Sequence, residues 1–398
     1  SITEGYHGEF IEADRLCDAA LSMEPRDDYR EYDEFFRSYL LMYYQPEEAV
    51  ERFRELAILQ PHSLLMHTQF AAALAEQASY KIDPVQCDEA RDEIEEAKRH
   101  IRQAKVLGPN NHFVQLIDLY VHCVEIGLDK AANKPDWNSK RPEVDQLAST
   151  LIETRTSAIG LYIVAWYYRI VEDNAQLENT MNILAKTIGS TFWQDCRSLG
   201  RGEYEPAPLD HADSSQMTPE QFGDVLLVLD SEEHRKHISR VWERDLYEKV
   251  KGTRHVAEAL SIPLLLNDEA RCRELASEAL SDLLKNDRLI RHYRKGIQTE
   301  LIEPLLRHLC AECGTQADKE LLRHATNTNQ VSQAHLQIGL KNLSQGHRQM
   351  ALKHFKLAAS EVAPWVVEAF LAEAFYNRMV IDETWPSWID FDAPENSQ

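Results

Sequence analysis

Three residues that could bind a metal ion lie close together in the sequence. His308, Cys310 and Cys313 form the pattern H-x-C-x-x-C, and imidazole and thiolate are the ligands that structural zinc sites use. A fourth ligand would be needed, and His324 is the nearest candidate. The pattern, however, lies inside a segment with the apolar period of one helix, whereas structural zinc ligands usually lie on turns. We therefore expect no metal ion here, and no cofactor in the chain.

A second pair, Arg348 and His354, has the loose arginine–histidine spacing of some helical ribonucleases. A helical hydrolase or nuclease is therefore one hypothesis, although such a spacing arises by chance in a chain with 16 histidines. The acidic run at 88–96 is typical of a solvated helix face rather than of a catalytic carboxylate pair. The sequence contains no H-E-x-x-H, P-loop, G-x-S-x-G or dinucleotide-binding fingerprint. We expect this chain not to be an enzyme.

The composition disfavours several other classes of protein. The 398 residues include 66 acidic and 43 basic side chains, which gives a net charge of −23. This surplus disfavours nucleic acid as a partner, because binding a phosphate backbone requires clustered lysine and arginine. The hydrophobic fraction of 43% is enough for a packed core, which excludes general disorder. Glycine (14 residues) and proline (15 residues) are too scarce for a turn-rich all-β fold.

The cysteines and the apolar segments of the sequence indicate the cellular compartment. Seven cysteines, an odd number, are scattered through helical-looking segments, which indicates reduced thiols rather than a disulfide framework. No stretch of 18 apolar residues occurs, and residues 1–25 lack the regions of a signal peptide. We expect a cytoplasmic location and no membrane partner.

The elements that position these residues are predicted to be helix hairpins that repeat along the chain. The clearest copy lies near the C-terminus and combines small residues, one aromatic ring and a final proline: Gly339, Gly346, Ala351, Phe355, Ala358 and Pro364. We expect the two helices to approach closely at Gly339, Phe355 to fill the gap between them, and Gly346 to support the turn. Pro364 should end the second helix, because proline has no N–H to donate.

Three further copies are in register within the first 110 residues. Their corresponding positions are Gly8, Ala13, Ala20 and Pro25, then Ala49, Phe53 and Pro61, and then Ala97, Ala104 and Pro109. Together the copies resemble the tetratricopeptide repeat, a helix–turn–helix unit of about 34 residues. The resemblance implies an all-α fold, in which antiparallel helix hairpins form a right-handed superhelical array, or α-solenoid. The middle of the chain departs from the repeat pattern.

We expect five segments along the chain. They are repeat-like hairpins at 1–129, divergent hairpins at 130–198, a linker at 199–219, hairpins at 220–380 that end in a repeat (331–364) and a capping helix, and an acidic tail at 381–398. Register places Ser1 inside the first helix of a repeat. We therefore also expect that the chain was cut from a longer polypeptide.

Two groups of aromatic residues are candidate peptide contacts. Tyr162, Trp166 and Tyr168 belong to one aromatic-rich helix, and Trp385 and Trp388 lie among acidic residues of the tail. Aromatic side chains are frequent anchors in protein interfaces. The alternative for the first group is packing in the core. The alternative for the second is that the tail folds over the terminal helix of its own chain.

The resemblance implies a non-catalytic scaffold or regulatory module that binds proteins or peptides. The acidic balance favours basic or apolar peptides as partners. The repeat family's clamp for acidic C-termini needs lysine, asparagine and arginine at set positions, and Lys341 with Asn342 do not complete it. A second hypothesis is a regulatory or sensory segment of a signalling enzyme, such as a protein kinase, whose catalytic domain precedes Ser1.

Overall fold

The fold is all-α over the part of the chain that the structure describes. A computed structural model describes residues 46–79, 81, 87–154, 156–188, 192–204, 226, 229, 231–248, 256–285, 301–311, 315–325, 328–360 and 367–391. Every regular element within these residues is a helix, which confirms the all-α prediction. None of these helices is long and apolar enough to cross a membrane. The chain divides into two compact units, Ser1–Leu184 with Arg294–Ile297 and Ala185–Tyr293 with Gln298–Gln398.

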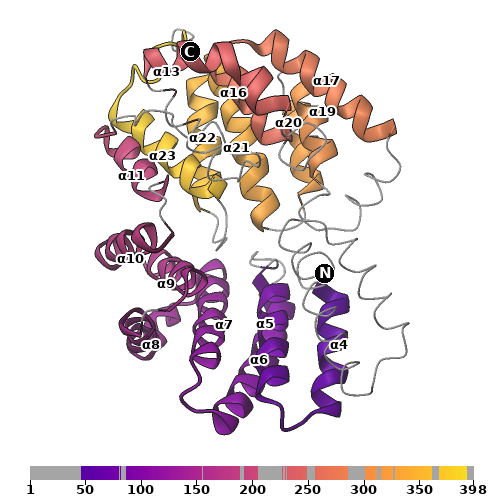
Figure 1. Cartoon of the computed structure of the whole chain (residues 1–398), viewed down its shortest axis with the longest axis vertical. Helices are drawn as coiled ribbons and strands as arrows, with labels where there is room; N and C mark the ends of the chain where they lie inside the picture. The colour runs from indigo at the N-terminus through magenta and orange to yellow at the C-terminus, as the bar shows by residue number, and fades with distance from the viewer. Residues whose placement is uncertain are drawn as a thin grey trace. The chain divides into compact units, whose positions relative to one another are not determined.

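The first unit is a succession of helices in which sequence neighbours pack together. Its elements are α4 (Pro46–Leu59), α5 (Leu64–Ser79), α6 (Cys87–Leu107), α7 (His112–Ala131), the 3-10 helix η1 (Trp137–Lys140), α8 (Arg141–Glu153), α9 (Ala158–Ile170) and α10 (Asn174–Ile188). Helix α5 packs between α4 and α6, and α7 packs against α5, α6, α8 and α9 (Figure 1).

Local signals in the sequence explain where the helices of the first unit begin and which face they bury. Asn111 caps α7, because its side-chain oxygen accepts the backbone N–H groups of Phe113 and Val114. On α6, Ala97 and Ala104 are completely buried, as are Ala49 and Phe53 on α4, so the predicted small and aromatic positions face neighbouring helices. The first predicted copy, with Gly8, Ala13, Ala20 and Pro25, lies outside the described residues.

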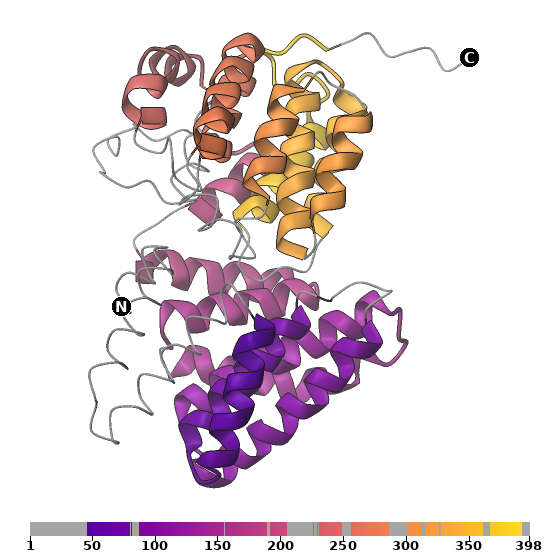
Figure 2. The same cartoon turned by 90° about the vertical axis from the view of Figure 1, so that its right-hand side faces the viewer.

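The second unit combines a helix from the middle of the chain with the C-terminal helices. Its elements are α11 (Phe192–Arg201), α13 (Glu232–Val241), the π-helix η2 (Trp242–Tyr247), α15 (Val256–Ala259), α16 (Ser261–Leu265), α17 (Glu269–Lys285), α19 (Ile302–Cys310), α20 (Thr315–His324), α21 (Thr328–Ser344), α22 (Arg348–Ser360) and α23 (Val367–Ile381). Helices α21, α22 and α23 lie side by side (Figures 1 and 2).

The start of the predicted linker is helical instead. Residues 199–201 form the last turn of α11, which packs against α23. Leu199 is buried, and a methyl group added at Gly200 would lie 3.3 Å from Cβ of Asn377. This tertiary contact extends the helix into a segment whose composition favours a turn. Residues 205–219 lie outside the described residues.

The α21–α22 hairpin has the close helix approach that the sequence predicts. A Cβ atom built on Gly339 would lie 2.5 Å from Cε1 of Phe355, so only glycine fits against this ring. Gly346 adopts φ = 78° between the two helices, in the left-handed region that glycine favours. Ala351 and Ala358 are completely buried. Pro364 lies outside the described residues.

Candidate functional site

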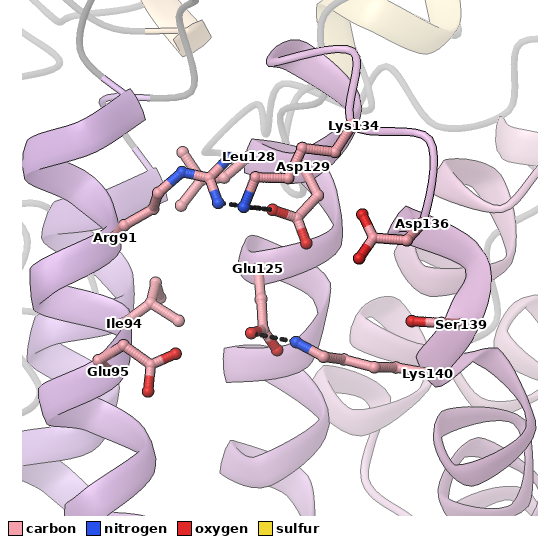
Figure 3. A pocket seen from close by; sticks show the side chains of 10 residues that line it. All are labelled: Arg91, Ile94, Glu95, Glu125, Leu128, Asp129, Lys134, Asp136, Ser139 and Lys140. Atoms are coloured by element: carbon pink, nitrogen blue, oxygen red, sulfur yellow. Dashed lines mark hydrogen bonds and ion pairs between the residues drawn. The ribbon is translucent and has the colours of Figure 1, made fainter.

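The first unit contains a charged hollow of about 290 Å³ between α6, α7 and the segment that follows α7 (Figure 3). Its lining includes four acidic and three basic side chains: Glu95, Glu125, Asp129, Asp136, Arg91, Lys134 and Lys140. Ile94, Leu128 and Ser139 complete the lining. The hollow is therefore suited to polar and charged groups rather than to an apolar ligand.

Helical spacing and one tight turn bring these residues together. Arg91 and Glu95 lie one helical turn apart on α6, and Glu125 and Asp129 have the same spacing on α7. Beyond α7 the chain reverses at Asn133, where φ is 52°, and the N–H of Lys134 donates to the carbonyl of Asp129. This turn returns η1 to the hollow.

Glu125 is the most buried charged group of the hollow. Its carboxylate accepts hydrogen bonds from Nζ of Lys140 and, at 2.9 Å, from Nζ of Lys98. His122 Nδ1 lies 3.5 Å from the second oxygen, Oε2, which accepts no hydrogen bond. Burial by itself would raise the pKa of Glu125, but His122 and the two ammonium groups outweigh it and hold that pKa well below its ordinary value. The carboxylate is therefore ionised.

A second ion-pair cluster lies at the end of α7. Arg91 Nη1 donates to Asp129 at 2.8 Å, and Lys134 Nζ lies 3.1 Å from the same carboxylate oxygen. Burial nevertheless raises the pKa of Asp129 above its ordinary value, despite the attraction of Arg91. Nη2 of Arg91 is buried and has no hydrogen-bond partner. Among the described residues, no basic side chain pairs with Asp136.

The ion pairs of Glu125 should contribute measurably to the free energy of unfolding. Glu125→Gln should lower the free energy of unfolding at neutral pH by about 1–2 kcal/mol, since it removes one partner from a part-buried network of charges. A carboxylate whose pKa is lowered by folding stabilises the protein above its ordinary pKa of about 4.5, and this contribution is lost as the pH falls through and below that value.

Urea unfolding of both proteins at a series of pH values measures this effect. The difference between wild type and Glu125→Gln should be largest near neutral pH and shrink towards about pH 3. Asp92→Asn on the exposed side of α6 is the control, and it should change stability little at any pH. A difference that does not vary with pH would contradict the proposed network.

The aromatic residues predicted to bind a peptide through α9 lie mainly in the interior. Trp166 and Tyr168 are each 3% exposed, and the ring centroid of Trp166 lies 5.7 Å from that of Tyr120 on α7. Tyr162 is half-buried. Because α9 packs against both α7 and α8, rings on more than one of its faces are covered. The core-packing alternative therefore describes Trp166 and Tyr168.

The tryptophans of the tail also pack against their own unit. Trp385 is 4% exposed, with its ring centroid 5.3 Å from that of Phe375 on α23. Nε1 of Trp388 donates to the carbonyl of Leu265 at 2.8 Å, and the Arg235 guanidinium lies 4.0 Å from the ring centroid of Trp388. As far as Phe391 the tail thus follows the alternative in which it covers its own helices, and these two rings are not free anchors for a partner.

The candidate zinc ligands that the structure describes, His308, Cys310 and His324, do not assemble into a site. His308 Nε2 lies 2.9 Å from Oδ1 of Asp318, and the exposed His324 lies 3.4 Å from Glu320. Cys310 belongs to α19, and Cys313 lies outside the described residues. Within the described ranges, no three His, Cys, Asp or Glu side chains are placed to hold a metal ion together. The described cysteines are Cys123, Cys196, Cys272 and Cys310, and no two of them form a disulfide bond with each other.

Arg348 and His354 have separate surroundings, although both lie on α22. The Arg348 guanidinium donates to backbone carbonyls of the chain between Met379 and Trp385. His354 instead contacts His335, with 2.9 Å between their Nδ1 atoms. The two side chains therefore do not share one reaction site.

The hollow is the feature that sequence reasoning missed. Residues 88–96 were expected to form a solvated helix face, and Glu95 is indeed exposed, but it lines the hollow together with the half-buried Arg91 and the buried Ile94. The sequence does contain one signal of the hollow. Glu125 and Asp129, near the end of the next helix, are one helical turn apart, as are Arg91 and Glu95.

No family model matches this chain, and no curated protein is significantly similar to it in sequence.

Proposed function

We propose that the chain is a non-catalytic interaction module, built from hairpins that resemble tetratricopeptide repeats, and that it binds a basic segment of a partner protein. The supporting observation is the uneven neutralisation of the carboxylates in the hollow. Glu125 and Asp129 each contact at least two basic groups. Glu95 contacts Lys98 alone, and Asp136 has no basic partner among the described residues. The least neutralised carboxylates are therefore Glu95 and Asp136.

These two carboxylates point into the hollow from opposite sides (Figure 3). A lysine or arginine side chain of a partner, inserted between them, would form ion pairs with both. The volume of about 290 Å³ is just below the roughly 300–1,000 Å³ found for small-molecule pockets, so it suits a single side chain. The net charge of −23 would attract a basic partner over longer distances, and this attraction should weaken as salt is added.

A peptide array tests the proposal. Peptides that are identical except for a central arginine, lysine, alanine or glutamate are probed with the purified chain, and we expect binding to the two basic series. Glu95→Gln with Asp136→Asn should weaken that binding by roughly tenfold, since both new ion pairs are lost. Asp92→Asn with Glu153→Gln removes the same charge from exposed positions on α6 and α8 and is the matched control. Equal losses in both double variants, or no preference for basic peptides, would refute the proposal.

A further inference from the structure

A pair of histidine rings joins the two helices of a hairpin in each unit. In the first unit, Nδ1 of His67 on α5 lies 2.9 Å from Nδ1 of His100 on α6, and the ring centroids are 5.1 Å apart. In the second unit, His335 on α21 and His354 on α22 have the same Nδ1–Nδ1 distance, 2.9 Å, and the same centroid distance, 5.1 Å. The contact therefore occurs twice with the same distances, and the rings are more tilted in the second pair, with an interplanar angle of 44° against 24° in the first.

The two pairs also occupy equivalent positions in their hairpins. His100 and His354 each lie three residues after one buried alanine and four before the next, which are Ala97 and Ala104 on α6 and Ala351 and Ala358 on α22. His67 and His335 each lie four residues before a small residue of the first helix, Ala71 and Gly339. The same side chains thus meet at the same point of two hairpins that belong to different units.

The hydrogen bonds of the first pair define which nitrogens carry protons. His67 Nε2 lies 3.0 Å from the carbonyl oxygen of Pro61, which can only accept, so Nε2 carries the proton of neutral His67. Its Nδ1 is then the acceptor, and Nδ1–H of His100 is the donor of the 2.9 Å contact. If both Nδ1 atoms carried protons, as they would with both rings protonated, two N–H groups would face each other and the contact would be lost.

The surroundings of His100 oppose proton uptake by its ring. Burial is the main reason that the pKa of His100 is lowered to about 4, and His67 contributes next. Arg54 of α4 and Arg99 of α6 also face His100 and lower its pKa, whereas Glu96 of α6 raises it.

The second pair has a similar environment. The pKa of His335 is lowered to about 4, mainly by burial and then by His354 and Lys353 of α22. Burial also lowers the pKa of His354, where Lys353 and His308 of α19 act in the same direction and Asp318 of α20 opposes them. His100 of the first pair and both rings of the second are therefore neutral near neutral pH.

We propose that the two histidine pairs form a proton-sensitive device that keeps both hairpins closed at neutral pH and loosens them in mild acid. Within the described ranges, no third ligand accompanies either pair as a metal site would require, so the chemistry that the pairs offer is proton uptake. This inference concerns the hairpins themselves and does not depend on the proposed partner.

The direction of the pH effect follows from proton linkage. An unfolded histidine takes up a proton near its ordinary pKa of about 6.5, whereas His100 and His335 in the folded chain resist it until about pH 4. Between these values the unfolded state binds more protons than the folded state, so the free energy of unfolding falls as the pH falls. The contribution of the pairs is fully present above about pH 6.5 and is lost progressively below it.

Thermal unfolding of the full chain at about pH 7.5 and about pH 5 tests the proposal. His100→Asn with His354→Asn replaces one ring of each pair by an amide that hydrogen-bonds but does not titrate. This double variant should lose roughly half or more of the fall in Tm that acid causes in the wild type. His62→Asn with His237→Asn changes one exposed histidine in each unit and should keep the full fall. An equal acid-induced fall in both double variants would overturn the proposal.

A measurement on the wild type covers the case in which the pair variant does not fold. In a chain labelled with 13C at histidine Cε1, the ring signals are followed by NMR between about pH 8 and about pH 4, with assignments from single variants. The signals of His100 and His335 should keep the neutral chemical shift at about pH 5.5, where fully exposed histidines are mostly protonated. Midpoints near 6.5 for both rings would equally overturn the proposal.

Discussion

Arg348→Met is expected to lower the free energy of unfolding of the second unit by about 3–5 kcal/mol and to release residues 382–391 from α22. Arg348 is the first residue of α22. Its guanidinium donates to the carbonyl oxygens of Trp385 at 2.6 Å, Asp382 at 3.0 Å and Met379. A hydrogen bond from a charged donor contributes about 1.5–3 kcal/mol, and we reduce the sum because the guanidinium is half-buried.

Amide hydrogen exchange measures the release directly. Amides of residues 382–391 should exchange faster in Arg348→Met, while those in the middle of α21 keep their protection. Arg348→Lys retains the charge but lacks the planar guanidinium group that reaches three carbonyls at once. The exchange rates of these amides in Arg348→Lys should therefore lie between those of the wild type and those of Arg348→Met. If residues 382–391 remain as protected in the methionine variant as in wild type, the carbonyl contacts do not hold this segment.

Arg348 also illustrates why some parts of the fold could be predicted from the sequence and others could not. The buried alanines Ala97, Ala104, Ala351 and Ala358 were predictable, because the helical period and the need for small residues at a helix crossing are local signals. The role of Arg348 was not, because its acceptors lie on a later segment of the chain. The arginine–histidine spacing suggested nuclease chemistry only because those acceptors were unknown.

The charged hollow and the buried aromatic residues depend on tertiary packing in the same way. A helix face rich in charged residues is typically exposed to solvent, and for that reason the sequence predicts that Arg91 and Glu95 contact water. Only the return of η1 beside α7 forms the hollow, in which Arg91 is half-buried while Glu95 remains exposed. Similarly, Trp166 and Tyr168 are both covered because α9 has neighbours on more than one side, which its own sequence does not specify.

Lys341→Met should destabilise the second unit by about 3–5 kcal/mol, although it keeps the length and volume of the side chain. Lys341 is 1% exposed, and its Nζ donates to the carbonyl oxygens of His308 and, at 2.7 Å, of Ala311, at the end of α19. A cation at this position satisfies carbonyls that have no partner within their own helix, and it stabilises the negative end of the helix dipole. The methionine leaves both carbonyls without this donor.

Thiol reactivity distinguishes a lost charge from a general loss of packing. Burial raises the pKa of Cys310, and the Lys341 ammonium opposes that rise. Removing the ammonium should therefore raise the Cys310 pKa further and slow its alkylation at a fixed pH, provided that the variant is folded.

Lys353→Met changes an exposed lysine on α22 in the same way and should alter stability by less than about 0.5 kcal/mol. If both variants unfold at the same urea concentration, the bonds from Lys341 to α19 do not stabilise the unit. Faster alkylation of Cys310 in a folded Lys341→Met variant would show that α19 has loosened around an intact core.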